Sequence, residues 1–365
     1  MNSKNDLKNL IKNNIKKKIF IITGKKSYKE SGAQTFFEEF LNKNKTKIYF
    51  KQNNIPILEE LVVLINEVRS YKPDLLLAIG GGSVIDYAKI ANVVEVKNNL
   101  KDLILNYDYR FQKKYTKLIV VPTTAGSGAE VTSNAVIYVD NIKYSFESEL
   151  LIPDEYFLIN DFVTSSPFKI KASAGFDAIA QATESLISKK SNNNSIEFGI
   201  KSLEISLEYF NSYLVEPNEL NSIKMLTASN LAGKAINISK TTAPHATSYP
   251  FTSLFGISHG HAVSLFFDNF LMFNFENSHK SQKIFDIGPR YEMLFKIYKV
   301  KNIFEFTQKI KKIKKYSNLE DNLDMLNIDL KDNMQKILDG INILRLKNNP
   351  VDLEREDIVK IINKK

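Results

Sequence analysis

The stretch DLLLAIGGGSVIDYAKIANVV, residues 74–94, decides the fold of this chain. Its run 74–79, apolar from Leu75 onward, is typical of a buried β-strand, and it leads through a glycine-rich turn directly into a helical pattern over 84–94. A strand that turns straight into a helix is the start of a βαβ unit. Because such units lay their strands side by side in one direction, the stretch predicts a parallel sheet covered by helices.

The segments on either side continue the alternation of strand and helix, and from residue 166 onward the pattern becomes purely helical. We therefore predict an α/β domain with a parallel, Rossmann-like sheet over 1–165 and an all-α domain over 166–365. Strands are expected at 18–23, 47–50 and 117–121, a β-hairpin at 134–139 and 143–146, and helices at 32–42, 57–71, 170–188, 196–213 and 220–238.

Length and composition agree with two domains. The 365 residues exceed the roughly 250–300 residues at which a single hydrophobic core stops growing. The chain has no cysteine, which excludes disulfides and thiolate metal ligands and fits a reducing compartment. No apolar run approaches the ~18 residues of a membrane span, and the start of the chain lacks the apolar region of a signal peptide. We expect a cytoplasmic protein that contacts no membrane.

The formal net charge of +9 raises the alternative of a nucleic-acid partner. The lysines are spread along the chain, however, and no pattern of interleaved basic and aromatic residues indicates a surface for single-stranded nucleic acid. A solvated, lysine-rich surface is the simpler interpretation, so we expect no nucleic-acid partner. Such a surface still raises the local concentration of an anionic substrate.

Two glycine-rich turns are candidates for nucleotide binding. Residues 80–83 lie between a strand and a helix, where backbone N–H groups and the helix dipole favour a pyrophosphate; a simple tight turn is the alternative. Residues 123–128, TTAGSG, again follow a strand, at the edge where open α/β sheets bind ligands. Their hydroxyls suit phosphate or ribose, although a helix N-cap would also explain them.

Polar residues inside an apolar helix are candidates for a metal site. Asp177 and Gln181 are four residues apart and share one helix face, with Glu184 one turn further on. Pairing of Asp177 with a lysine is the alternative to metal binding. His245 and His259 belong to different elements, and each alone would fit a core histidine. Together with Asp177 they form a set that suits Fe(II) or Zn(II).

Four separated motifs together resemble the iron-containing (group III) alcohol dehydrogenases. They are GGGSVIDYAK at 80–89, PTTAGSGAE at 122–130, DAIAQATE at 177–184, and a last motif that runs from His245 to SHG at 258–260. The resemblance spans about residues 17–275. It implies the dehydroquinate synthase-like architecture of a nucleotide-binding α/β domain followed by a helical, metal-binding domain, and it implies a homodimer.

The resemblance also implies which residues hold the metal. By their positions in the family motifs, Asp177, His245 and His259 are expected as metal ligands and catalytic residues. Where the family usually has a histidine as fourth ligand, this chain has Gln181, whose carbonyl oxygen is expected to serve instead. Where the family commonly has another histidine between the ligands, this chain has Tyr249. The expected metal is Fe2+, with Zn2+ as the alternative.

A dinucleotide cofactor is a further implication of the resemblance. NAD-preferring relatives tend to carry an aspartate after the first strand, where this chain reads TGKKS at 23–27. Without that acid, and with two lysines and a serine nearby, we expect NADPH, with NADH as the alternative. The expected cofactor-binding residues are Gly24, Gly81, Gly82, Ser83, Asp86, Thr123, Thr124, Ser127 and Lys143.

The segment before His245 looks more narrowly like the phosphonoacetaldehyde reductase branch of the family. Lys240, Thr241 and Thr242 supply a cation and two hydroxyls that suit a phosphonate, although Lys240 as a helix C-cap is the alternative. The other residues expected to contact substrate are Tyr249 and Asn134.

The branch implies reduction of phosphonoacetaldehyde to 2-hydroxyethylphosphonate by hydride transfer, with a divalent metal polarising the carbonyl. The partner is then a small anionic aldehyde. Two other enzymatic readings stay open: an alcohol dehydrogenase or aldehyde reductase for another small alcohol or polyol, and a dehydroquinate-synthase-like cyclase.

Overall fold

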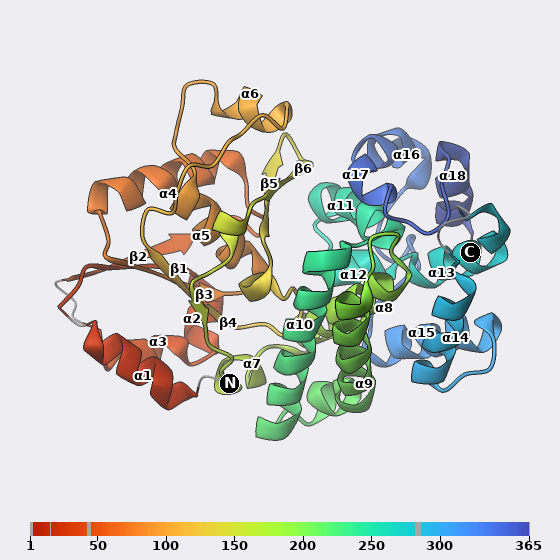
Figure 1. The fold of residues 1–365 in the computed structure, drawn as a ribbon, viewed down its shortest axis with the longest axis horizontal. Helices are drawn as coiled ribbons and strands as arrows, with labels where there is room; N and C mark the ends of the chain where they lie inside the picture. Colours follow the sequence, from red (N-terminus) through yellow and green to blue (C-terminus); the bar gives the residue numbers. More distant parts are fainter. Residues whose placement is uncertain (1–2, 15, 42–44, 282–285, 365) are drawn as a thin grey trace. The chain divides into compact units, whose positions relative to one another are not determined.

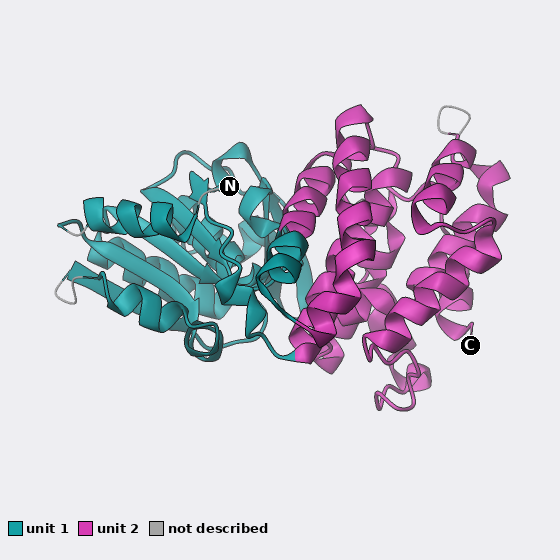
Figure 2. Cartoon of the chain, turned by 90° about the horizontal axis from the view of Figure 1, so that it is seen from below, with its two compact units in different colours: residues 1–167, 217–226 teal, residues 168–216, 227–365 magenta. Residues whose placement is uncertain are grey.

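The computed structural model describes residues 3–14, 16–41, 45–281 and 286–364. The chain divides into two compact units, shown in different colours in Figure 2. Unit 1 comprises Met1–Pro167 and Pro217–Leu226, and unit 2 comprises Phe168–Glu216 and Thr227–Lys365. The short segment Pro217–Leu226, which the sequence pattern places in the helical domain, groups with unit 1. There the Thr164 hydroxyl donates a hydrogen bond of 2.8 Å to Ser222 Oγ.

Unit 1 is built on a five-stranded sheet in the order β2-β1-β3-β4-β7. The first four of these strands are labelled in Figure 1. Every neighbouring pair of its strands is parallel, which confirms the predicted α/β fold. The strands are β1 (Ile19–Gly24), β2 (Thr46–Lys51), β3 (Leu75–Gly80), β4 (Lys117–Pro122) and β7 (Glu155–Tyr156). The expected hairpin is present as a separate antiparallel pair, β5 (Asn134–Val139) and β6 (Ile142–Glu147).

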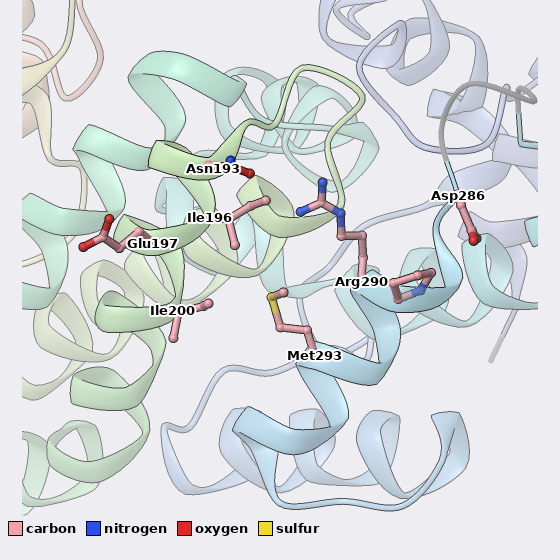
Figure 3. A pocket seen from close by; sticks show the side chains of 8 residues that line it. Asn193, Ile196, Glu197, Ile200, Asp286, Arg290 and Met293 are labelled. Atoms are coloured by element: carbon pink, nitrogen blue, oxygen red, sulfur yellow. The ribbon is translucent and has the colours of Figure 1, made fainter.

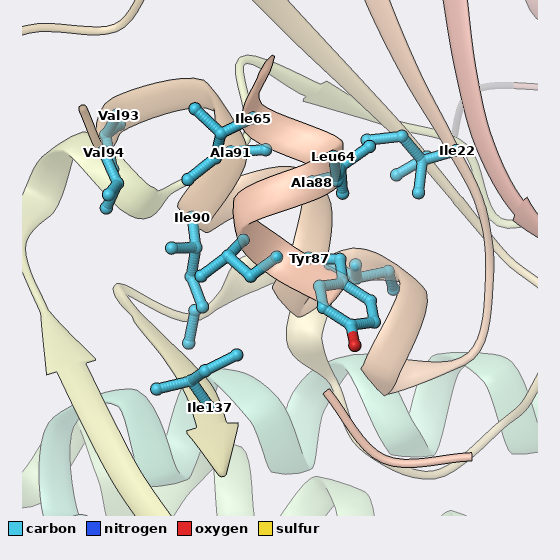
Figure 4. Packing of buried hydrophobic residues seen from close by; sticks show 14 of the residues in the cluster. Ile22, Leu64, Ile65, Tyr87, Ala88, Ile90, Ala91, Val93, Val94 and Ile137 are labelled. Carbon is cyan, nitrogen blue, oxygen red and sulfur yellow. The ribbon is translucent and has the colours of Figure 1, made fainter. Parts of the chain in front are cut away.

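Alternate residues of the central strands face opposite sides of the sheet, so each strand contributes to two cores. On one side Phe20, Leu76 and Leu118 pack with α4 (Leu58–Tyr71) and α5 (Gly82–Val93), and Figure 4 shows this core from close by. On the other side Ile21, Leu77 and Ile119 pack with α1 (Lys4–Asn13), α2 (Lys25–Glu30) and α3 (Ala33–Glu38). Because both of its faces are covered, the central strand β3 is apolar and buried along its whole length, as the run at 75–79 indicated.

The remaining helices of unit 1 are short: α6 (Leu100–Leu105) and α7 (Asp161–Thr164). The helix expected over 32–42 ends earlier, at Glu38, and residue 42 lies outside the described residues. A second short helix, α2, precedes it, and Gly32 between the two has φ of 77°. A left-handed residue ends one helix before the next begins, which is why the helical pattern is broken here.

Among its described residues, unit 2 contains helices joined by loops and no strand, as predicted. Its helix α8 (Phe168–Ile187) is buried on almost every side from Lys171 onward, so it lies inside the unit rather than on its surface. The other helices are α9 (Asn193–Val215), α10 (Glu219–Ser239), α11 (Ala243–Phe255), α12 (His259–Ser264), α13 (Phe267–Glu276), α14 (Gly288–Tyr298), α15 (Ile303–Tyr316), α16 (Leu330–Asp339), α17 (Ile343–Leu346) and α18 (Arg355–Asn363). Of these, α10 begins in the segment that groups with unit 1 and continues in unit 2 from Thr227.

The apolar faces of α11, α12 and α13 pack with those of α16 and α18 into one core of unit 2. Phe251, Phe270 and Ile337 are fully buried members of this core. Within the described ranges, no helix is both long and apolar enough to cross a membrane.

Candidate metal and cofactor sites

Helix α8 lines up three polar side chains, as their spacing predicted. Asp177, Gln181 and Glu184 are 4%, 4% and 0% exposed, so none of them is solvated. The Gln181 side-chain amide donates a hydrogen bond of 3.1 Å to Asp177 Oδ2. Buried polar groups of this kind require partners from other elements, because desolvating a carboxylate is costly.

Two histidines from different helices meet Asp177. His245 lies in α11, and its Nε2 is 3.1 Å from Asp177 Oδ1. His259 begins α12, and its Nε2 lies 3.9 Å from the same oxygen. One ligand atom from each of the three residues lies within 4.8 Å of the other two. Among the described residues, this is the group of histidine and carboxylate side chains whose geometry suits a metal ion.

Close packing of α12 on α8 brings His259 to this position. A Cβ atom on Gly260 would lie 1.9 Å from the backbone oxygen of Ser173, so only glycine permits the approach. On the next residue, the His261 N–H donates to Ser173 Oγ at 3.1 Å. The His261 ring is bonded through Nε2 to the Glu320 carbonyl at 2.7 Å, so this third histidine faces away from the metal group.

Glu184 is the site residue that sequence reasoning noted without assigning a role. Its Oε1 is hydrogen-bonded to His245 Nδ1, and its Oε2 accepts from the Thr242 N–H at 2.7 Å and the Thr242 hydroxyl at 2.8 Å. The signal was present in the sequence, since Asp177, Gln181 and Glu184 follow the i, i+4, i+7 spacing of one helix face. The hydroxyl of Thr242, expected to contact substrate, is therefore already engaged with Glu184.

The charges around His245 favour a cation at this site. Burial alone would lower the pKa of His245, but the neighbouring Glu184 and Asp177 outweigh burial and raise it to about 9. Two carboxylates and a buried imidazole thus require positive charge, which a proton on His245 or a divalent metal ion would provide. The donor set of one carboxylate and two imidazoles fits the metal ion implied by the sequence.

Tyr249 lies between His245 and His259 in the sequence, where the family that the chain resembles commonly has another histidine. Its ring packs against His259, with ring centroids 5.8 Å apart and 24° between the planes. Burial, opposed by the charge of Arg345, raises the pKa of Tyr249 to about 12, and Tyr249 also hydrogen-bonds the Thr241 side chain. The phenol is therefore neutral at physiological pH and is a poor proton relay there.

Lys240 lies at the end of α10 in the left-handed conformation, with φ of 59°. Its backbone N–H donates to the Ile236 carbonyl at 2.9 Å, so the backbone of Lys240 does close the helix C-terminus. The side chain is half-buried. The backbone of Lys240 can therefore end the helix while its ammonium group binds substrate.

In unit 1, the two glycine-rich turns come together at the carboxyl edge of the sheet. Gly80 at the end of β3 is paired with Pro122 at the end of β4. A Cβ atom on Gly81 would lie 3.2 Å from Thr124 Oγ1, and one on Gly82 would lie 3.0 Å from Ser127 Oγ. The two turns therefore form one surface. Because Gly81 and Gly82 have no side chains, a ligand can approach the backbone N–H groups there.

Three further observations concern the predicted cofactor residues of this edge. A Cβ atom on Gly24, at the end of β1, would lie 2.8 Å from Ser27 Oγ. Ser83 is partly exposed in the first turn of α5. The buried Thr123 hydroxyl has no hydrogen-bond partner among the residues that the structure describes. A glycine-rich turn whose residues 81–83 are partly exposed, together with such a hydroxyl, fits the phosphates and ribose of a dinucleotide.

Asp86, Lys143 and Asn134 lie around the second turn of α5. Burial raises the pKa of Asp86 to about 6, against the opposing effect of Lys89, Lys143 and the Val136 N–H. Lys89 donates to the carbonyl oxygens of Thr132 and Asn134, at 2.7 and 3.0 Å. A carboxyl group poised in this way is common at functional sites.

A surface pocket of about 550 Å³ lies between α9 and α14 in unit 2. Ile196 and Glu197 of α9 line it together with Arg290 and Met293 of α14 (Figure 3). None of the residues predicted for metal, substrate or cofactor is among those that line it.

A parallel α/β unit with a glycine-rich cradle, and a helical unit that gathers an aspartate and two histidines, are the combination expected of a metal-dependent dehydrogenase. Comparison with known families agrees with this class. Residues 2–159 match the family described as "Iron-containing alcohol dehydrogenase". Residues 171–365 match the family described as "Fe-containing alcohol dehydrogenase family, C-terminal". The chain belongs to the iron-containing alcohol dehydrogenase family. Its members are oxidoreductases that act on CH–OH groups, and membership implies a divalent metal, usually iron, and NAD(P).

Two curated relatives and a solved structure illustrate the similarity. A 4-hydroxybutyrate dehydrogenase from Clostridium kluyveri is 28% identical over 94% of this chain and 92% of that protein. A phosphonoacetaldehyde reductase from Streptomyces viridochromogenes is 26% identical over 59% of this chain and 57% of that protein. For four other relatives, the match covers between 25% and 56% of the relative's own length. An archaeal alcohol dehydrogenase from a Red Sea brine pool superposes with a TM-score of 0.87 and 21% identity, covering 99% of this chain and 95% of that one.

Proposed function

We propose that the protein reduces a small aldehyde that carries an anionic group at its other end. Phosphonoacetaldehyde is the proposed substrate and 2-hydroxyethylphosphonate the product. The observation that carries this proposal is the charge of Arg345 acting on Tyr249, whose ring packs on His259, a residue of the proposed metal site. Arg345 lies close enough for its positive charge to oppose the rise in the pKa of the Tyr249 hydroxyl. A second cation, Lys240, directly precedes Thr241, which is hydrogen-bonded to Tyr249.

The backbone supports the placement of Arg345 near Tyr249. Helix α17, which carries Arg345, is preceded by Asn342, whose N–H donates to the Ala246 carbonyl of α11 at 3.4 Å. It is followed by Asn348, whose side-chain amide donates to the Thr241 carbonyl at 3.2 Å. Both ends of α17 are thus tied to the segment that contains His245. A guanidinium held there suits the paired oxygens of a phosphonate or carboxylate.

Chemistry common to the two relatives supports an anionic substrate. Phosphonoacetaldehyde carries a phosphonate, and 4-hydroxybutyrate carries a carboxylate at the end opposite its hydroxyl. The match to the 4-hydroxybutyrate enzyme runs over nearly the whole chain, so a carboxylate-bearing alcohol or aldehyde is the second candidate. In both cases the anionic group would lie toward Lys240, Thr241 and Arg345.

Each element of the site has a proposed task. A divalent ion held by Asp177, His245 and His259 would polarise the aldehyde oxygen, and a reduced nicotinamide would supply the hydride. Water or the cofactor ribose would supply the proton of the product hydroxyl. Tyr249 would orient the substrate through its ring and its hydrogen bond to Thr241. Since Asp177 and His245 are 4% and 3% exposed, water is largely kept away from their side chains.

Gln181 is proposed as a fourth, neutral ligand. Its amide already lies against Asp177, and its carbonyl oxygen is a donor that Fe2+ and Zn2+ both accept. A neutral amide binds a divalent ion less tightly than an imidazole does, so we expect weaker retention of metal than in relatives with a histidine here. Fe2+ is the proposed metal and Zn2+ the alternative.

NADPH is the proposed cofactor, with NADH as the alternative. Support comes from the end of β1, where α2 begins with Lys25 and Lys26 in place of an acid that would repel a 2′-phosphate. The proposed cofactor residues are Gly24, Gly81, Gly82, Ser83, Asp86, Thr123, Thr124, Ser127 and Lys143, and Asn134 is proposed to contact substrate. A homodimer in the cytoplasm is the proposed assembly and location.

A panel of aldehydes tests the proposal. With NADPH, phosphonoacetaldehyde should be reduced with a kcat/KM about 100-fold above that of butanal, because a charge-assisted contact to the anion contributes roughly 2–3 kcal/mol. Succinate semialdehyde tests the carboxylate alternative.

Lys240→Ala should raise KM for phosphonoacetaldehyde much more than for butanal. Equal kcat/KM values for butanal and both anionic aldehydes would contradict an anion-binding site.

A further inference from the structure

The turn between α10 and α11 is held by the second half of α8 and by Ser188, the residue that follows it. Ser188 donates through its hydroxyl to the Ser239 carbonyl at 2.6 Å, and the Ser239 hydroxyl donates to Ser185 Oγ at 2.9 Å. One helical turn earlier, Glu184 accepts two hydrogen bonds from Thr242. The left-handed Lys240 lies between these two attachments. The conformation of residues 239–242 is therefore set by side chains of residues 184–188, at the end of α8 and directly after it.

The carboxylate of Glu184 reaches two different parts of the site at once. One oxygen accepts both donors of Thr242, and the other is hydrogen-bonded to Nδ1 of His245. Glu184 is 0% exposed, so water does not compete for these contacts. An ionised carboxylate only accepts hydrogen bonds, so His245 must carry its proton on Nδ1. The Nε2 atom, which faces Asp177, is then the atom left for a metal.

We propose that Glu184 is a positioning residue for the metal centre. It fixes the tautomer and ring orientation of His245, and through Thr242 it joins that metal ligand to the turn that carries Lys240 and Thr241. This inference rests on the proposed ligation of a metal by His245. Glu184 touches neither the metal nor the substrate in this account, so its effect passes entirely through His245 and Thr242.

The carboxylate cannot be replaced by an isosteric amide without loss. In Glu184→Gln, one acceptor oxygen becomes an NH2 group, which only donates. If the amide nitrogen faced Thr242, it would meet two donors, and if it faced His245, it would meet the Nδ1–H. In either orientation one hydrogen bond is lost. The negative charge that balances a bound cation is lost as well.

Titration of the metal-stripped, full-length protein with Zn2+, in competition with a chelator, tests the proposal without substrate. Glu184→Gln should weaken Zn2+ affinity by about 10–100-fold, the usual effect of removing an outer-shell partner of a ligating histidine. Thr242→Val retains the carboxylate and the backbone N–H contact, so its affinity should fall by less than that of Glu184→Gln. In the Zn2+-bound wild type, ¹⁵N NMR of histidine should show a proton on Nδ1 of His245.

Glu60→Gln is the matched control. Glu60 is also a buried carboxylate, bonded to Gln52, Asn53 and Tyr87, but it lies in unit 1. Its variant should lose stability and keep wild-type affinity for Zn2+. The proposal is overturned if Glu184→Gln binds Zn2+ as tightly as the wild type, or if Glu60→Gln weakens binding equally. If Glu184→Gln fails to fold, two other results decide. The proposal is overturned if Thr242→Val binds Zn2+ as tightly as the wild type and the NMR spectrum of the Zn2+-bound wild type shows His245 protonated on Nε2. A wild-type protein without affinity for Zn2+ would instead refute the metal site itself.

Discussion

Replacement of Asp177 by asparagine should abolish tight metal binding and lower kcat/KM for the aldehyde by about 10³-fold. Asp177 Oδ1 is the atom that both His245 Nε2 and His259 Nε2 approach. Asparagine keeps the shape of the side chain but removes its negative charge, so the ion loses its single anionic ligand among the three. Loss of carbonyl polarisation worth roughly 4 kcal/mol corresponds to that thousandfold change.

Metal content and steady-state kinetics of Asp177→Asn check this expectation, with Glu60→Gln as a variant that also removes a buried carboxylate. Glu60→Gln should retain both metal and activity. A metal-free Asp177→Asn enzyme with wild-type kcat/KM would mean that the aspartate has a structural role only. A metal-loaded variant of normal activity would mean that the other ligands suffice.

Replacement of Gly260 by alanine should destabilise unit 2 by about 1–3 kcal/mol and weaken metal binding. The new methyl group would lie 1.9 Å from the Ser173 carbonyl oxygen, which is a backbone atom and cannot turn aside. Helix α12 must therefore move away from α8, and His259, the residue before Gly260, must move away from Asp177. Urea unfolding and Zn2+ titration measure the two effects.

Gly256→Ala is the control for this variant. Gly256 has φ of +67°, and among the described residues no heavy atom lies within 4 Å of the place that its Cβ would take, so alanine there meets backbone strain without a clash. It should cost about 1 kcal/mol and leave metal affinity unchanged. Should Gly260→Ala bind metal as tightly as Gly256→Ala, the close approach of α12 to α8 would not be what positions His259.

Much of unit 1 follows from its sequence because the relevant signals are local. A strand buried on both faces is apolar throughout, so 75–79 could be recognised without knowledge of its neighbours. The turn residues after β3 and β4 are equally visible. Helix α2 (Lys25–Glu30) was missed, because its six residues are too few and too polar to show the apolar period of a helix; α3 begins next to residue 32, where a helix was expected to start.

The candidate metal site was predictable in part. The spacing of Asp177 and Gln181 indicated a shared helix face, and the family resemblance supplied the two histidines from elsewhere in the chain. The role of Glu184 required the tertiary structure, because its partners His245 and Thr242 are about 60 residues away in the sequence. Arg345 was missed for the same reason, since nothing in the sequence around α17 indicates proximity to Tyr249.

Metal analysis combined with an NADPH oxidation assay tests the central claim most directly. The purified protein, assayed with phosphonoacetaldehyde, should contain about one divalent ion per chain, in line with a single Asp177, His245 and His259 group among the described residues. Chelation should remove the ion and the activity together, and Fe2+ or Zn2+ should restore the activity. A thoroughly metal-free protein that still reduces phosphonoacetaldehyde at the original rate would contradict the account.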